Sequence, residues 1–157
     1  MAKSPAQQLP LKFRTGRKTD VRAQFAALCW RIKNDQLQIC LVTSRNSQRW
    51  ILPKGWPMHK QTPALAAATE AMEEAGVSGD AIDHCVGVYT YSKPLKVDGA
   101  PIVVMVYPVH VLHVHSKWPE KHQRRRKWFS AKKAAKKLSE PQLKHIVATF
   151  APHKLRK

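Results

Sequence analysis

The chain has 157 residues and a mass of 17.8 kDa, the size of one compact domain. Its 28 Lys and Arg against 10 Asp and Glu give a formal net charge of +18. This excess excludes an acidic, solvating protein and makes an anionic partner the first expectation. Nucleic acid, anionic lipid and phosphorylated small molecules all remain open as that partner.

The cysteines and the N-terminal segment narrow the class of protein further. Cys29, Cys40 and Cys85 are widely spaced and form no C-x-x-C pair, which argues against a secreted disulfide scaffold and a structural zinc site. We expect buried free thiols in a reducing compartment. No segment approaches the roughly 20 consecutive apolar residues of a membrane span. Residues 1–20 lack the apolar stretch of a secretory signal, so we expect a flexible basic leader on a cytoplasmic protein, with an organellar transit peptide as the alternative.

The first half of the chain alternates strand and helix patterns. Apolar runs at 23–32 and 37–43 flank the turn signal Asn34-Asp35, which predicts a β-hairpin. A short strand at 50–52 stops at Pro53, and a loop follows it. Thr62 is suited to cap a helix that has Pro63 in its first turn, and Gly76 is suited to end it.

The second half continues the pattern. Further strands are predicted at 85–91, 102–114 and 127–129, and helices at 130–138 and 140–150. Strands interleaved with a central helix and a terminal helix predict an α/β domain with a mixed sheet over residues 21–152. Residues 153–157 form a short basic tail.

Three of the ten acidic residues fall within five positions of the central helix. Glu70, Glu73 and Glu74 have the spacing i, i+3, i+4 and would share one face of an α-helix. Like charges at this spacing repel, but a divalent cation cancels the repulsion, and converging carboxylates suit Mg²⁺ or Mn²⁺. A solvated acidic helix face is the alternative, and the triplet alone does not decide between the two interpretations.

The surroundings of the triplet resemble the Nudix box, G-x5-E-x7-R-E-U-x-E-E-x-G-U, where U is aliphatic. Residues 70–76 are E-A-M-E-E-A-G, Val77 follows, and Gly55 stands in register at the start. The resemblance implies a Nudix-like α/β/α sandwich with a mixed central sheet and a hydrolase that cleaves diphosphate linkages with Mg²⁺ or Mn²⁺. It also implies that Glu70, Glu73 and Glu74 are catalytic and bind the metal together with the backbone of Gly55.

Two positions depart from the box. Gln61 stands where the family has its first glutamate, and Thr69 stands where it has arginine. In the family these side chains orient the metal-binding carboxylates, and losing such support typically costs 10–100-fold in metal affinity or activity. We therefore expect a phosphohydrolase that is slowed. A Nudix fold that has lost catalysis and only binds a polyphosphate or nucleotide is the alternative.

Other segments resemble the diphosphoinositol polyphosphate phosphohydrolase branch of the family. They read T-S-R-N-S-Q-R-W-I-L-P-K-G-W-P, Y-T-Y and R-R-K-W-F-S. The resemblance implies diphosphoinositol polyphosphates, dinucleoside polyphosphates or related nucleotides as substrates. By position, Arg22, Arg45 and Arg49 match phosphate-binding basic residues of the branch, and Lys54 matches the L-P-K-G form of diadenosine polyphosphate hydrolases.

Residues 117–137 hold 10 of the 28 basic residues and raise two further candidates. Glu120 is the only acid between Asp98 and Glu140, which makes it a candidate for an extra carboxylate at the site, with an ordinary loop position as the alternative. Arg126 is a candidate for phosphate contact. RNA binding or 5′-end processing through this stretch is the less favoured function, since basic residues beside Trp128 could hold RNA phosphates. The sequence predicts no membrane partner and leaves the oligomeric state open.

Overall fold

The computed structural model describes residues 22–92 and 101–155 of the chain. The basic leader predicted for residues 1–20 and the last two residues of the predicted tail, 156 and 157, lie outside this part. Residues 153 and 154, at the start of that tail, belong to a 3₁₀ turn (Pro152–Lys154). Among the described residues, no helix combines the length and hydrophobicity that crossing a bilayer requires.

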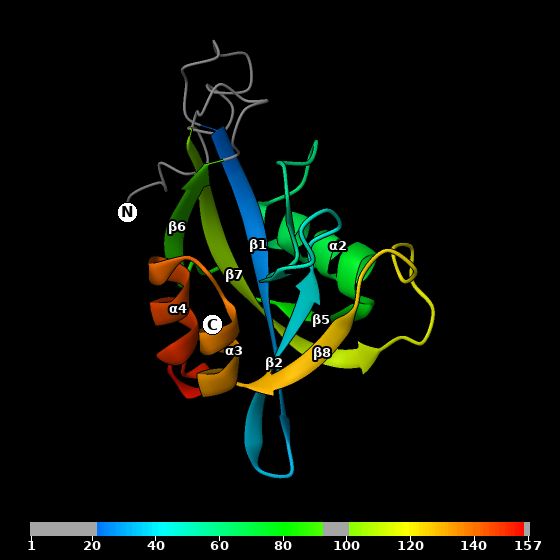
Figure 1. Cartoon of the computed structure of the whole chain (residues 1–157), viewed down its shortest axis with the longest axis vertical. Coiled ribbons are helices and arrows are strands. Elements are labelled where there is room, and N and C mark those ends of the chain that lie inside the picture. The colour runs from blue at the N-terminus through cyan, green and yellow to red at the C-terminus, as the bar shows by residue number, and fades with distance from the viewer. Residues whose placement is uncertain (1–21, 93–100, 156–157) are drawn as a thin grey trace.

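A mixed sheet forms the centre of the fold (Figure 1). Its two longest strands, β1 and β7, run parallel from the pair Arg22–Ile102 to the pair Trp30–His110. The remaining strand pairs are antiparallel, so the prediction of a mixed sheet is confirmed. The strands are β1 (Arg22–Lys33), β2 (Gln36–Thr43), β3 (Trp50–Ile51), β4 (Lys54–Gly55), β5 (Val77–Ala81), β6 (Gly87–Ser92), β7 (Pro101–Val114) and β8 (Arg126–Ser130).

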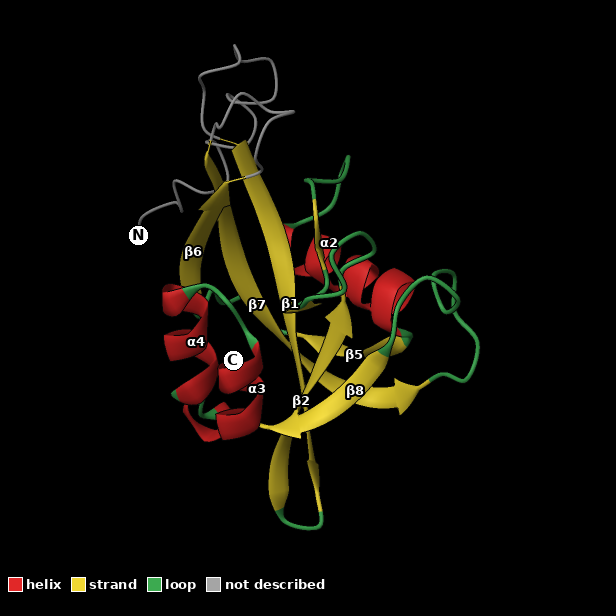
Figure 2. Ribbon diagram, viewed as in Figure 1, coloured by secondary structure: helices red, strands yellow, loops and turns green. Residues whose placement is uncertain are grey.

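Helices cover both faces of the sheet (Figure 2). Helix α2 (Pro63–Glu70) packs on one face through Ala64, Ala66 and Ala67, whose small side chains permit close contact with β1. Helices α3 (Ala131–Lys137) and α4 (Pro141–Ala148) cover the other face, with Leu143 and Val147 in the second core. Because β1 has helices on both sides, it is buried continuously from Ala23 to Trp30. The predicted α/β/α sandwich is confirmed.

The hairpin between β1 and β2 forms where the turn signal predicts it. Asn34 and Asp35 have φ angles of 52° and 63°, and positive φ at both central residues is the requirement of a type I′ hairpin turn. The backbone twist of this turn matches the twist of the strands, which fixes the pairing of Lys33 with Gln36.

Three sequence-based expectations about strands were wrong. Lys54–Gly55, expected in a loop, pairs with β1 as strand β4, which is too short to show a periodic pattern. Strand β5 was missed because V-S-G-D-A does not alternate and carries an irregular register at Ser78 and Gly79. Strand β6 begins at Gly87, so Cys85 lies before it and is exposed, unlike the buried Cys29 and Cys40.

The central helix begins and ends as predicted, but its last turn is not α-helical. The Thr62 side chain accepts a hydrogen bond from the Leu65 N–H (3.2 Å), and Gly76 ends the helix with φ = 65°. Between Glu70 and Gly76 the backbone forms a π-helical turn (Ala71–Ala75). Such turns are frequent at functional sites, and this one contains two of the three clustered glutamates.

The structure predicts a specific cost for changing Gly76 to alanine. A left-handed conformation costs an L-residue about 1–2 kcal/mol, and a Cβ here would also overlap the ring of Trp118. We expect Gly76→Ala to lower the unfolding free energy by more than 2 kcal/mol in urea denaturation. In a Trp118→Ala background the same change should cost only the backbone part, about 1–2 kcal/mol. Equal losses in both backgrounds would contradict the overlap.

Candidate active site

The pairing of β4 with β1 places Gly55 directly against the side chain of Glu70. Gly55 lies opposite Phe25 in this pairing, and a Cβ at Gly55 would overlap the Glu70 carboxylate. Glycine is therefore required here by close approach, not by its backbone angles. The contact brings the loop before α2 onto the acidic end of the helix.

Glu70 and Glu74 form a pair of neighbouring, partly buried carboxyl groups. Burial raises the pKa of Glu70 to about 8, and the negative charge and hydrogen bond of Glu74 contribute to the same shift. Burial also raises the pKa of Glu74 above its usual range, against the opposing effect of Arg124. Two carboxylates held this close carry a free-energy cost that a bound cation would remove.

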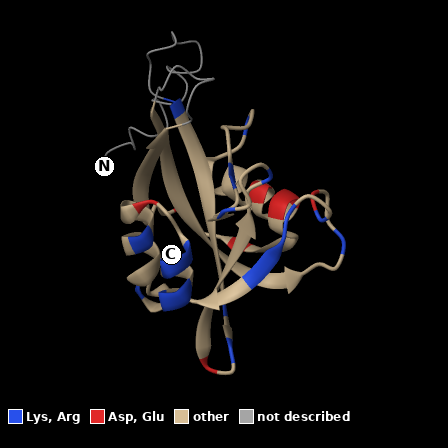
Figure 3. Ribbon diagram, in the orientation of Figure 1, with Lys and Arg blue, Asp and Glu red and all other residues tan. Residues whose placement is uncertain are grey.

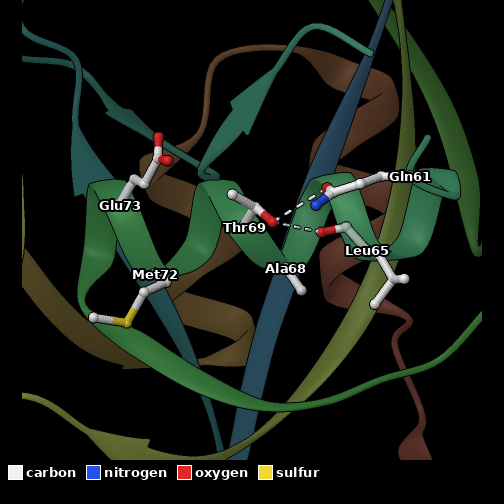
Figure 4. Close-up of a pocket in the computed structure, with 6 residues that line it drawn as sticks. All are labelled: Gln61, Leu65, Ala68, Thr69, Met72 and Glu73. Atoms are coloured by element: carbon white, nitrogen blue, oxygen red, sulfur yellow. Dashed lines mark hydrogen bonds between the residues drawn. The ribbon is translucent and has the colours of Figure 1, made fainter. Parts of the chain in front are cut away.

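Glu73 lies on the π turn between the two members of this pair. Its negative charge raises the pKa of Glu70, after the larger effects of burial and of Glu74. Glu73 also lines a pocket of about 370 Å³ beside Thr69 and Met72 (Figure 4). The expectation that all three glutamates bind one metal ion stays a prediction. Within residues 22–92 and 101–155, no group of three or more His, Cys, Asp or Glu is arranged as a metal-binding cluster.

The structure places Glu120 beside the carboxylate pair. Its backbone N–H donates to the Glu73 carbonyl (3.1 Å), and its charge raises the pKa of Glu70 and of Glu74. The Glu120 carboxylate accepts a hydrogen bond of 2.7 Å from Arg124 Nε. Arg124 thus links the Glu120 carboxylate to Glu74, and the role of Glu120 as an extra carboxylate stays a prediction.

Arg124 is the residue that sequence reasoning missed. Its side chain is only 7% exposed, and Nη2 lies 3.7 Å from Glu74 Oε2 while Nε binds Glu120. Nη1 also donates to the Thr43 carbonyl (3.0 Å), which fixes the guanidinium against β2. Arg124 is the first of three consecutive arginines, and the sequence does not show which of the three contacts the carboxylates. The one available signal is its position four residues after Glu120, the nearest acid in sequence.

Arg126, a candidate for phosphate contact, binds the end of the helix instead. Its Nη1 donates to the carbonyls of Ala75 and His115, both at 2.9 Å. Its guanidinium also lies over the Trp118 ring, 4.1 Å from the centroid. The Ala75 carbonyl is one that the helix end leaves without a partner, and the His115 carbonyl lies just after β7. The guanidinium is therefore committed to holding the loop before β8 against the helix.

Lys54 is the basic candidate closest to the acidic pair. Its backbone N–H donates to Glu74 Oε1 (3.3 Å), and its ammonium lies over the Tyr91 ring. Burial lowers the pKa of Lys54, and the charge of Glu74 opposes that shift. Lys54 thus brings a positive charge close enough to the carboxylates for the charge of Glu74 to act on it.

The three arginine candidates differ in their contacts. The Arg49 side chain is half exposed and pairs with Glu140 at 4.0 Å. Arg45 is exposed and donates to Gln123 (3.2 Å), next to Arg124 in sequence. Arg22 lies at the start of β1, opposite Ile102.

Gln61 and Thr69, the two departures from the box, contact each other. Thr69 Oγ1 lies 3.3 Å from Gln61 Oε1 and donates to the Leu65 carbonyl at 3.0 Å (Figure 4). A neutral pair thus occupies the place where the box has opposite charges. The contact is preserved, although its electrostatic strength is reduced.

The chemistry of the neighbouring carboxyl groups suits a hard divalent cation. Glu70 and Glu74 supply carboxylate oxygens, and the Gly55 backbone lies against the Glu70 side chain. Oxygen ligands of this kind suit Mg²⁺ and Mn²⁺. Burial raises the pKa of both carboxyl groups, and a bound cation would favour their charged form.

The amino-acid sequence is similar to those of known proteins. The family model for the NUDIX domain matches residues 22–150. Over 106 residues the chain is 32% identical to Nudix hydrolase 13, mitochondrial, of Arabidopsis thaliana, covering 64% of this chain and 52% of that protein. It thus spans about half the length of that relative. It is 29% identical to human diphosphoinositol polyphosphate phosphohydrolase 3-beta over 131 residues, covering 82% of this chain and 76% of that protein.

Solved structures share the fold at low sequence identity. A Caenorhabditis elegans Ap4A hydrolase superposes with a TM-score of 0.61 at 16% identity, covering 85% of this chain and 98% of that one. The NUDIX domain of Shewanella oneidensis NrtR, complexed with ADP ribose, gives a TM-score of 0.63 at 14% identity, covering 92% and 95%. The match of the family model over most of the chain and the shared fold agree: this chain belongs to the Nudix family.

Proposed function

We propose that the protein is a divalent-metal-dependent hydrolase of diphosphate linkages in phosphorylated small molecules. The observation that carries the proposal is the partly buried pair Glu70–Glu74, with Glu120 fixed beside it by Arg124. Relatives named as diphosphoinositol polyphosphate phosphohydrolases, and a structural neighbour named as an Ap4A hydrolase, support this choice of reaction. We propose diphosphoinositol polyphosphates and dinucleoside polyphosphates as the substrates.

The side chains of the site have distinct tasks in this reaction. Glu70 and Glu74 would hold Mg²⁺ or Mn²⁺ with Glu120 and the Gly55 backbone. When bound, the ion supplies neutralisation of phosphoryl oxygens and a lower pKa of attacking water. Lys54 places positive charge beside the carboxylates and would bind a phosphate adjoining the cleaved bond.

The residues around this centre orient the reacting groups. Arg45 and Arg49, at the edge of the site, would bind outer phosphates of the substrate with their bidentate guanidinium groups. Arg124 orients the Glu74 and Glu120 carboxylates, and a carboxylate of the group accepts the proton of the attacking water. The cytoplasmic location expected from the sequence stays a prediction, since Arabidopsis relatives are named as mitochondrial.

Removing the charge of the carboxylate pair should abolish the reaction. We expect Glu70→Gln combined with Glu74→Gln to lower kcat/KM for Mg²⁺-dependent phosphate release at least 100-fold, because both proposed ligands become neutral. Diadenosine tetraphosphate and a diphosphoinositol polyphosphate are assayed in parallel with a phosphate-release method. Asp80→Asn, which neutralises an exposed acid on β5, is the matched control and should behave as wild type. Wild-type turnover in the double variant would exclude this site.

Restoring the charges of the box should raise the rate. In Gln61→Glu with Thr69→Arg, an ion pair replaces the neutral contact of 3.3 Å and orients the helix more strongly. We expect turnover to rise about tenfold, the lower end of the usual effect of supporting residues. Each single variant should stay at or below wild type because it introduces an unpaired charge. Unchanged turnover in the double variant would show that the neutral pair is sufficient.

Without metal, the stability of the protein should fall as the pH rises. The folded-state pKa of Glu70 is about 8, above its ordinary value of 4.5, so folding favours the protonated form. This stability is complete below pH 4.5 and is lost as the pH rises through about 8. We expect Tm measured in EDTA to decrease over this interval, with a smaller decrease in Glu70→Gln. Added Mg²⁺ should raise Tm more at pH 8 than at pH 5, and a pH-independent effect of Mg²⁺ would contradict the assignment.

A further inference from the structure

Helix α3 presents a row of four lysines to the outside of the molecule. Ala134, Ala135 and the following Leu138 are buried against the sheet, whereas every lysine of the helix is exposed. The lysines are Lys132, Lys133, Lys136 and Lys137, and Figure 3 shows their charge gathered on this helix. With the exposed Lys127 on β8, we call them the α3 lysine surface.

The arrangement is unfavourable for the isolated helix. Lys132–Lys136 and Lys133–Lys137 are like-charge pairs at spacing i, i+4, each costing roughly 0.2–0.5 kcal/mol. Lys132 and Lys133 also lie in the first turn, where the helix dipole disfavours positive charge. Among the described residues, no ion pair or hydrogen bond involves the ammonium groups of these four lysines, and the nearest partner is the Phe129 ring, 6.0 Å from Lys137 Nζ. An external polyanion would relieve this repulsion.

Two of the three consecutive arginines before the lysines are used inside the protein. Arg124 is bound to Glu74 and Glu120, and Arg126 is bound to carbonyls at the end of the central helix. Arg125 is exposed, but its guanidinium lies over the Trp50 ring, 5.1 Å from the centroid. The lysines of β8 and α3 therefore form the densest group of exposed positive charge in this basic stretch.

The α3 lysine surface is separate from the carboxylate site. Helices α3 and α4 cover the face of the sheet opposite to α2, which carries the glutamates (Figure 2). The one acid between residues 126 and 155, Glu140, pairs with Arg49 and so neutralises little of this charge. A partner bound on α3 would leave the glutamates accessible.

We propose that the α3 lysine surface binds the sugar–phosphate backbone of single-stranded nucleic acid without recognising its bases. Lysines four residues apart are about 6 Å apart along the helix axis, a separation similar to that of neighbouring phosphates on one strand. Binding through phosphates alone is independent of sequence. Phe129, the aromatic residue beside Lys127 and Lys137, is buried in the core under α3 and offers no free face for base stacking.

The same surface lacks what a membrane contact requires. Amphipathic membrane helices insert large apolar side chains beside their lysines. Among the described residues, the exposed large hydrophobic side chains belong to other elements than β8, α3 and α4. They are Ile32, Trp56, Leu65, Val88, Leu112 and Val114. Nucleic acid, which needs only positive charge, is therefore the better match.

The test compares two variants of equal net charge by fluorescence anisotropy with a labelled 20-nucleotide uridine RNA. The first replaces the four α3 lysines with Gln, which has a similar helix propensity. The control replaces four other exposed lysines with Gln: Lys33, Lys60, Lys117 and Lys121. Four lost phosphate contacts should reduce the salt slope of log K by about 3 and weaken binding about 100-fold near 0.1 M salt. The control should lose far less.

Each outcome decides the proposal. RNA affinity in Glu70→Gln/Glu74→Gln should equal that of wild type, because the two sites lie on opposite faces of the sheet. Turnover of small-molecule substrates should be unchanged in the α3 variant, and its Tm should equal or exceed that of wild type because repulsion is removed. Equal losses of RNA affinity in the two lysine variants would overturn the proposal. So would α3-dependent binding to phosphatidylserine vesicles in the absence of α3-dependent RNA binding.

Discussion

The close packing of the central helix on the sheet determines the chemistry of this protein. Alanines on the inner face of α2 bring the helix near β1, and Gly55 lets the β4 backbone reach the Glu70 side chain. Two carboxyl groups thereby become partly buried and share one environment, which raises the pKa of both. A larger side chain at Gly55 or in the alanine face would separate these elements. The electrostatic properties of the site therefore follow from the packing of small residues.

The loop between β7 and β8 is held to the helix end by a network of polar contacts. Trp118 Nε1 donates to the Glu74 carbonyl (3.1 Å), the Glu120 N–H donates to the Glu73 carbonyl, and Arg126 binds the Ala75 carbonyl. These donors meet carbonyls that the end of a helix leaves unpaired. The same contacts that complete the helix position Glu120 and Arg124 beside Glu74. The contacts that cap the helix therefore also position the side chains of the site.

The sequence was sufficient for those features that depend on local chemistry. The caps Thr62 and Gly76, the Asn34-Asp35 turn and the long apolar strands have strong local signals, and the structure confirms them. Strand β4 is defined only by its pairing with β1, and a strand of two residues has no sequence pattern from which it could be predicted. The π turn likewise depends on how the helix end meets the loop, so the spacing of the glutamates did not predict it.

The large positive charge has two roles, and the difference between arginine and lysine separates them. A guanidinium offers several donors in one plane and can bind a carboxylate and a carbonyl together, as Arg124 does with Glu120 and Thr43. An ammonium on a flexible, strongly hydrated stem loses more on burial, so the α3 lysines stay outside while the alanines between them pack inward. Lys54 is the exception, buried where the negative charge of Glu74 opposes the lowering of its pKa. The net charge of the chain therefore does not describe either region. The buried Arg124 balances the carboxylates of Glu74 and Glu120, whereas the exposed α3 lysines leave positive charge available to a partner.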